Sequence, residues 1–248
     1  MKQDVRSINL LFPVLNERLR LKNGIERSMA YLKENVTIPY QLTILDNGSE
    51  DETPEIGKAL AAKYPEVSYV RVGERGVGVA FRKGISINTC NLVGYMDIDL
   101  STDLKYLGKT IEMFQNDPNL QYVNGSRFSK ESDTKGRKWY RKITSMGLVL
   151  LLKTLFHMKA TDAVCGFTFL RKEVAEQLVK ESSQDNGWFY TIEFLLRAER
   201  DGMKIYDMPV EWQEDYNTTV KVWKTIKNYL IQMYHLKKAF RQEDKLRK

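Results

Sequence analysis

The chain has 248 residues, 42% hydrophobic and 29% charged, which predicts a soluble globular protein with a sizeable core in one α/β domain, alone or with an added helical portion. The formal net charge of +7 favours anionic partners: nucleic acid, phosphorylated substrates or anionic membrane surfaces. Two cysteines, Cys90 and Cys165, exclude a disulfide framework and suit a reducing cytoplasm; with no signal-peptide core and no run of about 18 apolar residues, we expect neither a leader nor a membrane span.

Apolar runs alternate with amphipathic stretches along the first hundred residues. This pattern predicts strands at 8–14, 41–46, 67–72 and 92–97. Helices are expected after the first strand, where Leu21, Ile25, Met29 and Leu32 share a face, and in a segment that runs to Tyr64. Strands that alternate with helices favour a parallel, doubly wound sheet.

The second half continues the alternation. The same reasoning predicts helices at 104–115, 172–180 and 190–201, strands at 121–124, 168–170 and 204–209, and a basic amphipathic helix from Val222 onward with Val222, Ile226, Leu230 and Met233 on one face.

Two acids, Asp97 and Asp99, stand where the strand 92–97 stops. In an extended segment, residues i and i+2 point to the same side, so both carboxylates could hold a hard cation such as Mg²⁺ or Mn²⁺. In open α/β sheets, ligands lie at the carboxyl ends of strands. The alternative is a turn or a helix cap, which is the common use of such residues.

Two further loops carry polar or glycine-rich signals. A dinucleotide fingerprint needs a third glycine three residues after Gly78, but the next glycine is Gly84. This loop is therefore either a plain turn or a diphosphate loop that uses the Arg82 guanidinium. Asp46 ends the second strand, where it could bind a base or ribose or make an Asx turn. Glu17 could simply favour a helix N-terminus.

The motifs occur in an order that resembles family 2 of the inverting glycosyltransferases, which have the GT-A fold. Those motifs are the segments 12–17, 46–53, 75–84 and 97–101. Three later segments look like the dolichyl-phosphate mannose and glucose synthase branch of that family: 124–128, 162–167 and 187–193. The likeness covers roughly residues 7–222. It implies one domain over 1–222, with a nucleotide-sugar half (1–103) and an acceptor half (104–222), followed by a helix at 223–248.

The resemblance also implies roles for single residues. Pro13, Asn16, Glu17 and Asp46 would line the nucleoside pocket, Gly76, Gly78 and Arg82 would lie near the diphosphate, Asp97 and Asp99 would bind the cation and the donor diphosphate, and Arg127, Arg141 and Ser145 would bind an acceptor phosphate. The last set has independent physical sense, because a phosphate monoester needs clustered donors and arginine supplies them in a fork.

The leading hypothesis is therefore transfer of a hexose from a UDP- or GDP-sugar to polyprenyl phosphate, at the cytoplasmic face of a membrane and with Mg²⁺ or Mn²⁺. An ionised phosphate needs no general base. A second hypothesis is transfer to a saccharide hydroxyl, which would need a base such as Asp162 or Glu193. A third is a nucleotide-sugar-binding module without turnover. Nucleic acid is not expected as a partner, since the basic residues lack interleaved aromatic platforms.

Several positions depart from the family pattern. Asn47 stands where a second Asp is common, Val77 where Lys is frequent and Thr191 where relatives often carry Asp. Lys221 only partly replaces an arginine of some polyprenyl-phosphate synthases.

The apolar run 146–152 is too short to span a bilayer. It is either a buried helix or an interfacial helix, flanked by basic residues that include Arg137, Lys138, Arg141, Lys142 and Lys153. The basic tail could be a second contact or a solvated face. We expect membrane association to be peripheral.

Overall fold

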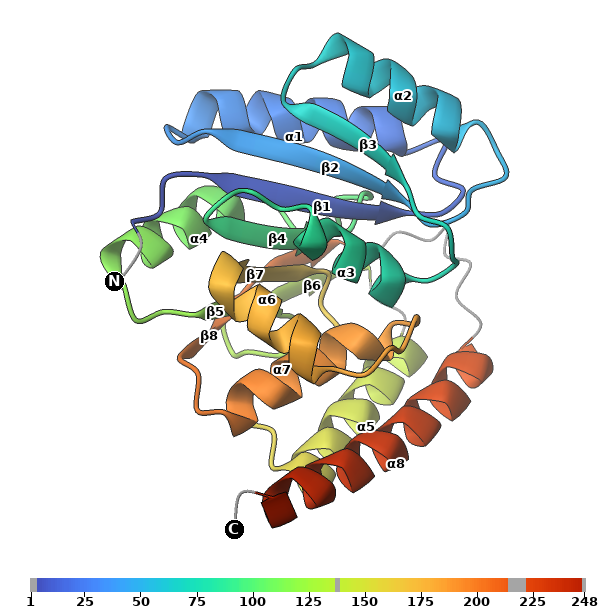
Figure 1. Cartoon of the computed structure of the whole chain (residues 1–248), viewed down its shortest axis with the longest axis vertical. Helices are drawn as coiled ribbons and strands as arrows, with labels where there is room; N and C mark the ends of the chain where they lie inside the picture. The colour runs from blue at the N-terminus through green and yellow to red at the C-terminus, as the bar shows by residue number, and fades with distance from the viewer. Residues whose placement is uncertain (1–3, 137–138, 214–221, 247–248) are drawn as a thin grey trace.

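The computed structural model describes residues 4–136, 139–213 and 222–246. A seven-stranded sheet runs through its centre (Figure 1) and contains β1 (Ile8–Val14), β2 (Tyr40–Asp46), β3 (Val67–Arg71), β4 (Leu92–Met96), β5 (Tyr122–Ser126), β7 (Phe167–Arg171) and β8 (Ile205–Pro209). The strands lie in the order β3-β2-β1-β4-β7-β5-β8. All neighbours are parallel except β7, which is antiparallel to β4 and β5. The expected mostly parallel α/β sheet is confirmed.

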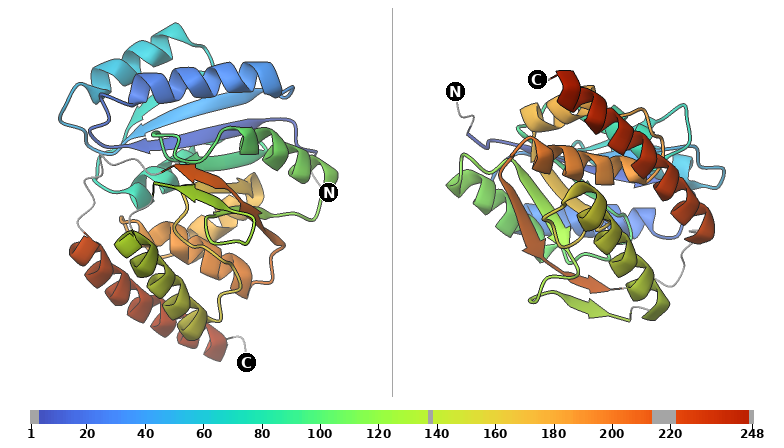
Figure 2. Two further views of the ribbon diagram at one scale, coloured as in Figure 1. Left: turned by 180° about the vertical axis from the view of Figure 1, so that it is seen from behind. Right: turned by 90° about the horizontal axis from the view of Figure 1, so that it is seen from below.

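Helices cover both faces of this sheet, and each face has its own apolar core (Figures 1 and 2). One core is formed with α1 (Leu21–Asn35), α2 (Thr53–Lys63) and α4 (Lys105–Asn116). The other is formed with α3 (Val77–Ser86), α6 (Lys172–Glu181) and α7 (Phe189–Arg200). The expected α1 face is confirmed, since Leu21, Ile25 and Leu32 are fully buried and Met29 packs against them.

Two long helices, α5 (Trp139–Phe156) and α8 (Val222–Leu246), lie side by side at one end of the molecule (Figures 1 and 2). The Lys237 Nζ donates to the Leu155 carbonyl at 2.9 Å, and the rings of Phe156 and Phe240 are 6.0 Å apart. No helix in the three described ranges combines the length and apolarity needed to cross a bilayer.

Local differences from the expected pattern have simple causes. The glycine-rich segment 75–84 is mostly helix, because α3 begins at Val77. The strands β6 (Asp133–Lys135) and β9 (Glu211–Gln213) form a second sheet, which the sequence did not predict because neither strand has alternating apolar residues. Of the residues expected on one face of the tail helix, Met233 is buried and Leu230 is 51% exposed. Arg137, Lys138 and Lys221 lie outside the described residues.

Candidate functional site

The site lies where the direction of strand order reverses. β1 leads through β2 to β3 on one side, and β4 pairs with β1 on the other. In open α/β sheets this switch point leaves a crevice outside the carboxyl ends of the two strands. Asn16 and Glu17 follow β1, and Asp97 follows β4. The polar motifs of the first hundred residues therefore meet at one edge of the sheet.

The segment after β1 is locked to the loop after β2. The Asn16 backbone N–H donates to the Ser49 hydroxyl at 2.9 Å, and the Asn16 side-chain oxygen accepts from the Glu50 backbone N–H at 2.8 Å. The Glu17 backbone N–H donates to the Thr53 hydroxyl at 2.7 Å. Asn16 itself has a φ of 57°, a region that Asn tolerates better than most residues. The two motifs thus shape each other before any ligand binds.

Asp46 has no exposed surface and is used by the fold. Its Oδ1 accepts the backbone N–H groups of Gly48 and Ser49, the pattern of an Asx turn. Its Oδ2 accepts the Tyr69 hydroxyl at 2.6 Å and the Arg71 guanidinium at 3.2 Å. Burial would raise the pKa of Asp46, but these bonds outweigh it and hold the pKa below its usual range. In this structure Asp46 shapes the loop, and its expected place in the lining of the nucleoside pocket stays a prediction.

The two acids after β4 lie on a turn, not on an extended segment. β4 ends at Met96, the Leu100 backbone N–H donates to the Asp97 carbonyl at 3.1 Å, and Leu100 has a φ of 53°. The Asp99 Oδ1 accepts the Ser101 backbone N–H at 2.9 Å. The expected i, i+2 geometry of a strand is therefore wrong here, although the electrostatics show that the two carboxylates are near each other.

Negative charge accumulates at Asp97. Burial and the charge of Asp99 raise the pKa of Asp97 to about 7, with a further contribution from Glu17. The Tyr95 hydroxyl, which donates to Asp97 Oδ1 at 2.8 Å, and the Arg127 guanidinium oppose this shift only in part. An uncompensated pair of hard oxygen ligands is the donor set that Mg²⁺ or Mn²⁺ prefers. Within the described residues, no three His, Cys, Asp or Glu side chains gather as a metal site, so further ligands would come from a substrate.

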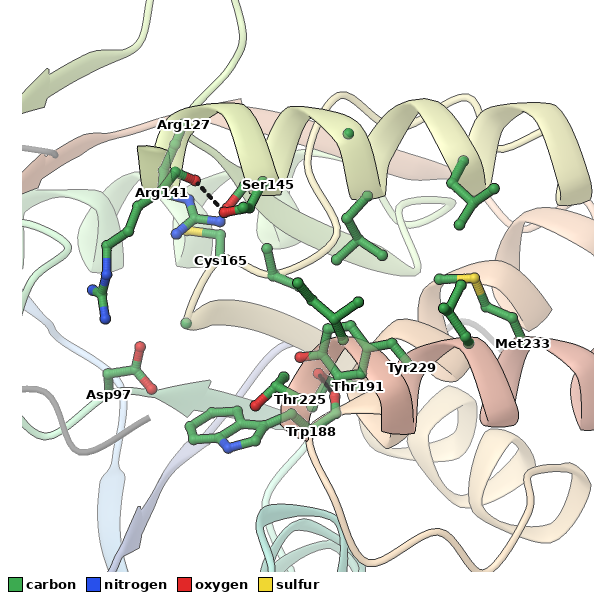
Figure 3. A pocket seen from close by; sticks show the side chains of 18 of the residues that line it. Asp97, Arg127, Arg141, Ser145, Cys165, Trp188, Thr191, Thr225, Tyr229 and Met233 are labelled. Atoms are coloured by element: carbon green, nitrogen blue, oxygen red, sulfur yellow. Dashed lines mark hydrogen bonds between the residues drawn. The ribbon is translucent and has the colours of Figure 1, made fainter. Parts of the chain in front are cut away.

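One cavity of about 450 Å³ extends from Asp97 to the groove between α5 and α8. Figure 3 shows Asp97, Arg127 and Arg141 at one end of it and Met233 at the other. Ser145 also lines it, as do apolar side chains of the two helices: Leu148, Leu151, Ile226, Leu230 and Met233. The structure thus brings Asp97 together with all three residues expected at the acceptor phosphate. Asn16 instead borders a separate hollow formed with Arg18 and four acidic residues, Glu50, Asp51, Glu52 and Glu55.

Arg127 lines the cavity, and its guanidinium is held in place by an acid and an aromatic ring. The Arg127 Nε and Nη2 donate to the two oxygens of Asp162 at 2.7 and 3.1 Å, and the guanidinium lies 4.9 Å from the ring of Trp212. Burial would raise the pKa of Asp162, but Arg127 holds it below its usual value. Such a fork-to-fork pair fixes the guanidinium in plane and leaves its remaining N–H groups for another acceptor.

The two acids considered as bases for a hydroxyl acceptor are both engaged elsewhere. Asp162 is bound by Arg127, and Glu193 accepts from Ser183 and from the Arg197 Nε at 2.8 Å. Neither is among the described residues that line the cavity.

Arg82 is likewise occupied. Its Nη1 donates to the Asp185 carbonyl and its Nη2 to the Asn186 side-chain oxygen, each at 2.6 Å. The loop before α7 therefore holds the Arg82 guanidinium in this structure, and the expected contact of Arg82 with a diphosphate stays a prediction.

The apolar run 146–152 lies within α5, which has two faces. Val149 and Leu152 are buried, whereas Trp139, Ile143, Met146 and Leu150 are 74%, 60%, 51% and 66% exposed. These four positions recur at helical spacing and form one stripe, which we call the α5 stripe. The reading of this run as a simply buried helix is therefore wrong. Exposed apolar stripes of this size mark interaction surfaces.

The cavity also contains residues that the sequence did not point to. Trp212, Thr225 and Tyr229 line it, and the Trp212 indole N–H is buried with no partner among the described residues. Trp188 and Thr191 come from a segment that carries the resemblance, but their side chains had no assigned role. No local sequence pattern predicts Trp212, Thr225 or Tyr229, because only the fold brings them near Arg127.

The comparisons with known proteins agree with this architecture. The model of glycosyl transferase family 2 matches residues 10–179. The glycosyltransferase AglD of Haloferax volcanii is 26% identical over 221 residues, which are 88% of this chain but 35% of AglD, so the chain spans about a third of that relative. The dolichyl-phosphate beta-glucosyltransferase ALG5A of Trichomonas vaginalis is 28% identical over 228 residues, or 89% of this chain and 70% of that protein.

Among solved structures, glucosyl-3-phosphoglycerate synthase from Mycobacterium tuberculosis, in complex with Mn²⁺, uridine diphosphate and glucosyl-3-phosphoglycerate, superposes with a TM-score of 0.70 at 17% identity. It covers 94% of this chain and 80% of that one. At this identity the likeness concerns the fold, and it confirms the expected GT-A architecture.

Proposed function

The chain belongs to glycosyltransferase family 2, and from this premise we propose that it transfers a hexose from a UDP- or GDP-sugar to a polyprenyl phosphate, with inversion, at the cytoplasmic surface of a membrane. Membership in a family of enzymes sets aside the binding module without turnover. The names of the dolichyl-phosphate relatives support a lipid-phosphate acceptor.

One observation carries the choice of acceptor. The same cavity has Arg127, Arg141 and Ser145 near Asp97 at one end and an apolar groove between α5 and α8 at the other. A polyprenyl phosphate has this division, with a doubly charged head on an apolar chain. A saccharide would leave the apolar part of this lining, formed by Leu148, Leu151, Ile226, Leu230 and Met233, without a partner.

The reaction needs little from the protein beyond position and charge. The acceptor phosphate carries about −1.5 to −2 charge at pH 7 and is already a nucleophile. Arg127 and Arg141 would hold it so that one oxygen attacks the anomeric carbon from the face opposite the leaving group. The new C–O bond forms as the bond from that carbon to the diphosphate breaks, and the nucleoside diphosphate leaves with the electron pair.

Asp97 and Asp99 fit a divalent cation, Mg²⁺ or Mn²⁺, because Tyr95 and Arg127 relieve their mutual repulsion only in part. When bound, the cation would act as a Lewis acid that stabilises the leaving diphosphate. The Mn²⁺ and uridine diphosphate in the M. tuberculosis structure support this assignment. Pro13, Asn16, Glu17 and the 74–78 loop would form the nucleoside side, which is the proposed role of residues 1–103.

Transfer to a saccharide hydroxyl is the less favoured alternative. It requires a free base, but Asp162 is paired with Arg127 and Glu193 with Arg197, and neither acid is among the described residues that line the cavity.

The place of action follows from the α5 stripe. Its apolar side chains stand beside Arg141, Lys142 and Lys153, a combination that favours insertion at an anionic interface. Such a peripheral contact would place the groove where a polyprenyl phosphate lies.

A transfer assay tests the proposal. Purified protein, Mn²⁺ or Mg²⁺, radiolabelled UDP- or GDP-hexoses and a short polyprenyl phosphate should move label into the organic phase, from which mild acid releases it. Release of nucleoside diphosphate only when glycans are added would support the saccharide acceptor instead. Absence of transfer with every donor and acceptor would contradict both.

A further inference from the structure

The donor-side loop, residues 74–78, is held in place by a loop from the far half of the chain. A Cβ at Gly76 would meet the Asn186 carbonyl oxygen at 1.9 Å, and one at Gly78 would meet the Asp185 carbonyl oxygen at 2.3 Å. Gly76 also has a φ of 140°. These glycines are therefore required by the approach of residues 185 and 186, independently of any phosphate.

Asn186 directs three polar groups toward this loop and α3. Its carbonyl accepts the Gly78 backbone N–H at 3.0 Å, its side-chain oxygen accepts the Arg82 Nη2 at 2.6 Å, and its Nδ2 donates to the Glu74 Oε2 at 2.9 Å. Glu74 is the first residue of the loop, and Arg82 follows it in α3. One half-buried amide thus bridges an exposed acid and an arginine whose plane is also packed on the Tyr190 ring at 4.8 Å.

The segment that carries Asn186 is itself anchored. The Ser183 backbone N–H and hydroxyl both donate to Glu193, which is 1% exposed and paired with Arg197. The Gly187 backbone N–H donates to the Asp185 carboxylate at 3.1 Å. Because the segment that carries Asn186 is fixed by these bonds, it can hold the loop 74–78 in one conformation.

We propose that Asn186 is a positioning residue for the donor: its amide holds the loop 74–78 in the conformation that receives the nucleoside diphosphate. The loop lies at the correct edge, because the Gly76 backbone N–H reaches the Asn47 side-chain oxygen at 3.3 Å, beside the end of β2. The inference rests on the proposed use of a nucleoside-diphosphate sugar, but not on the identity of the acceptor.

The pair Glu74–Asn186 allows an exchange of hydrogen-bonding roles. In Asn186→Asp the introduced carboxylate still accepts from Arg82 but faces the carboxylate of Glu74. Adding Glu74→Gln supplies an amide donor at position 74, so the double variant restores the bond and the net charge. Asn119→Asp, at an exposed position before β5, controls for a new acid alone.

Calorimetry with UDP and GDP in the presence of Mn²⁺, without acceptor, measures the effect on the full-length chain. We expect Asn186→Asp to bind the nucleotide about tenfold more weakly, the double variant to return to within about threefold of wild type, and the acceptor KM to change little in all variants. A purely structural role would lower thermal stability without this selective recovery.

Three results would overturn the inference: unchanged nucleotide affinity in a folded Asn186→Asp variant, no recovery in the double variant, or a change confined to acceptor KM. If wild type binds nucleotide and the variants match it, this inference alone fails. If wild type binds neither nucleotide, the proposed function fails with it.

Discussion

Arg127 and Asp162 form a buried, bidentate ion pair in which the Arg127 Nε lies 2.7 Å from the Asp162 Oδ2. The exposed fractions of the two side chains are 7% and 0%. The Arg127 backbone N–H also donates to the same carboxylate, at 3.2 Å. Asp162 therefore fixes both the backbone position of Arg127 and the orientation of its guanidinium. A charge that would otherwise be costly to bury becomes a fixed guanidinium in the cavity wall, where we propose that it binds the acceptor phosphate.

Replacing Asp162 should damage both stability and acceptor use. Asp162→Asn leaves Arg127 without its counter-charge, so we expect unfolding free energy to fall by about 3 kcal/mol and acceptor KM to rise by about tenfold or more. The apolar pair Arg127→Met with Asp162→Leu should recover much of the stability but none of the transfer. Denaturant unfolding and steady-state kinetics separate the two effects. Equal recovery of stability and activity would show that the pair is structural only.

Arg141 offers a test without a stability cost. It lies on the first turns of α5 and lines the cavity, so Arg141→Ala should raise acceptor KM about tenfold, the value of one charge-assisted hydrogen bond. Donor KM and thermal midpoint should stay near wild type. Lys142→Ala, the adjacent exposed cation, is the matched control. The same loss in both variants would indicate a general electrostatic effect instead of a phosphate contact.

Much of the fold was predictable because apolar periodicity reports burial directly. β4 has no polar break and β1 has only Asn9, which is buried, and α1 shows its buried face in the spacing of Leu21, Ile25 and Leu32. Strand ends were less certain, since a single residue with positive φ, Leu100, turns the chain just after β4.

The site was predictable only where its signal is local. Asp97 is marked by its local sequence, next to Asp99 and after an apolar strand. Trp212 and Tyr229 reach the cavity only because the strand and helix that carry them pack there, which no local sequence pattern predicts. The sequence marks Gly76, Gly78 and Arg82, but it does not show that all three contact a remote loop at residues 185 and 186. The sequence left Asp46 open between a ligand contact and a turn, and the backbone N–H groups of Gly48 and Ser49 show that it makes the turn.

Removing the charge of Asp97 should stabilise the metal-free protein. The pKa of Asp97 is about 7 in the folded state against an ordinary value of 3.8, so the folded state loses stability as pH rises from about 4 to 7. Asp97→Asn removes this penalty, and we expect about 1–2 kcal/mol of added stability at pH 8 and a smaller gain at pH 5. Asp97→Asn and Asp99→Asn should both nearly abolish transfer.

Thermal unfolding at the two pH values, with Glu34→Gln as an exposed control, measures the stability change. A gain that is equal at pH 5 and pH 8 would mean that packing, not charge, is responsible.

Cation binding should depend on pH through the same carboxylate. The ion binds the ionised form of Asp97, and burial and the Asp99 charge raise its pKa to about 7, so protons compete with the metal below neutrality. The apparent Kd for Mn²⁺ in the presence of nucleoside diphosphate should rise by about tenfold for each pH unit below 7 and level off above it. Titration between pH 5.5 and 8.5 tests this, with the nucleotide's own protonation subtracted in protein-free runs. An affinity that does not change across pH 6–8 would contradict the site.

The α5 stripe should carry membrane binding. Ile143→Glu with Leu150→Glu places two charges on the stripe, at positions 60% and 66% exposed, where a charged side chain can reach solvent. Binding to vesicles that contain anionic lipid should fall by at least about tenfold, because each apolar side chain loses roughly 1–2 kcal/mol of interfacial burial. Turnover on a short, water-soluble acceptor should persist, since neither residue is among the described lining of the cavity. Leu19→Glu, at a position 85% exposed outside α5 and α8, controls for added charge on an apolar surface site. If vesicle binding falls equally in this control, or not at all in the double variant, the stripe is not the membrane contact.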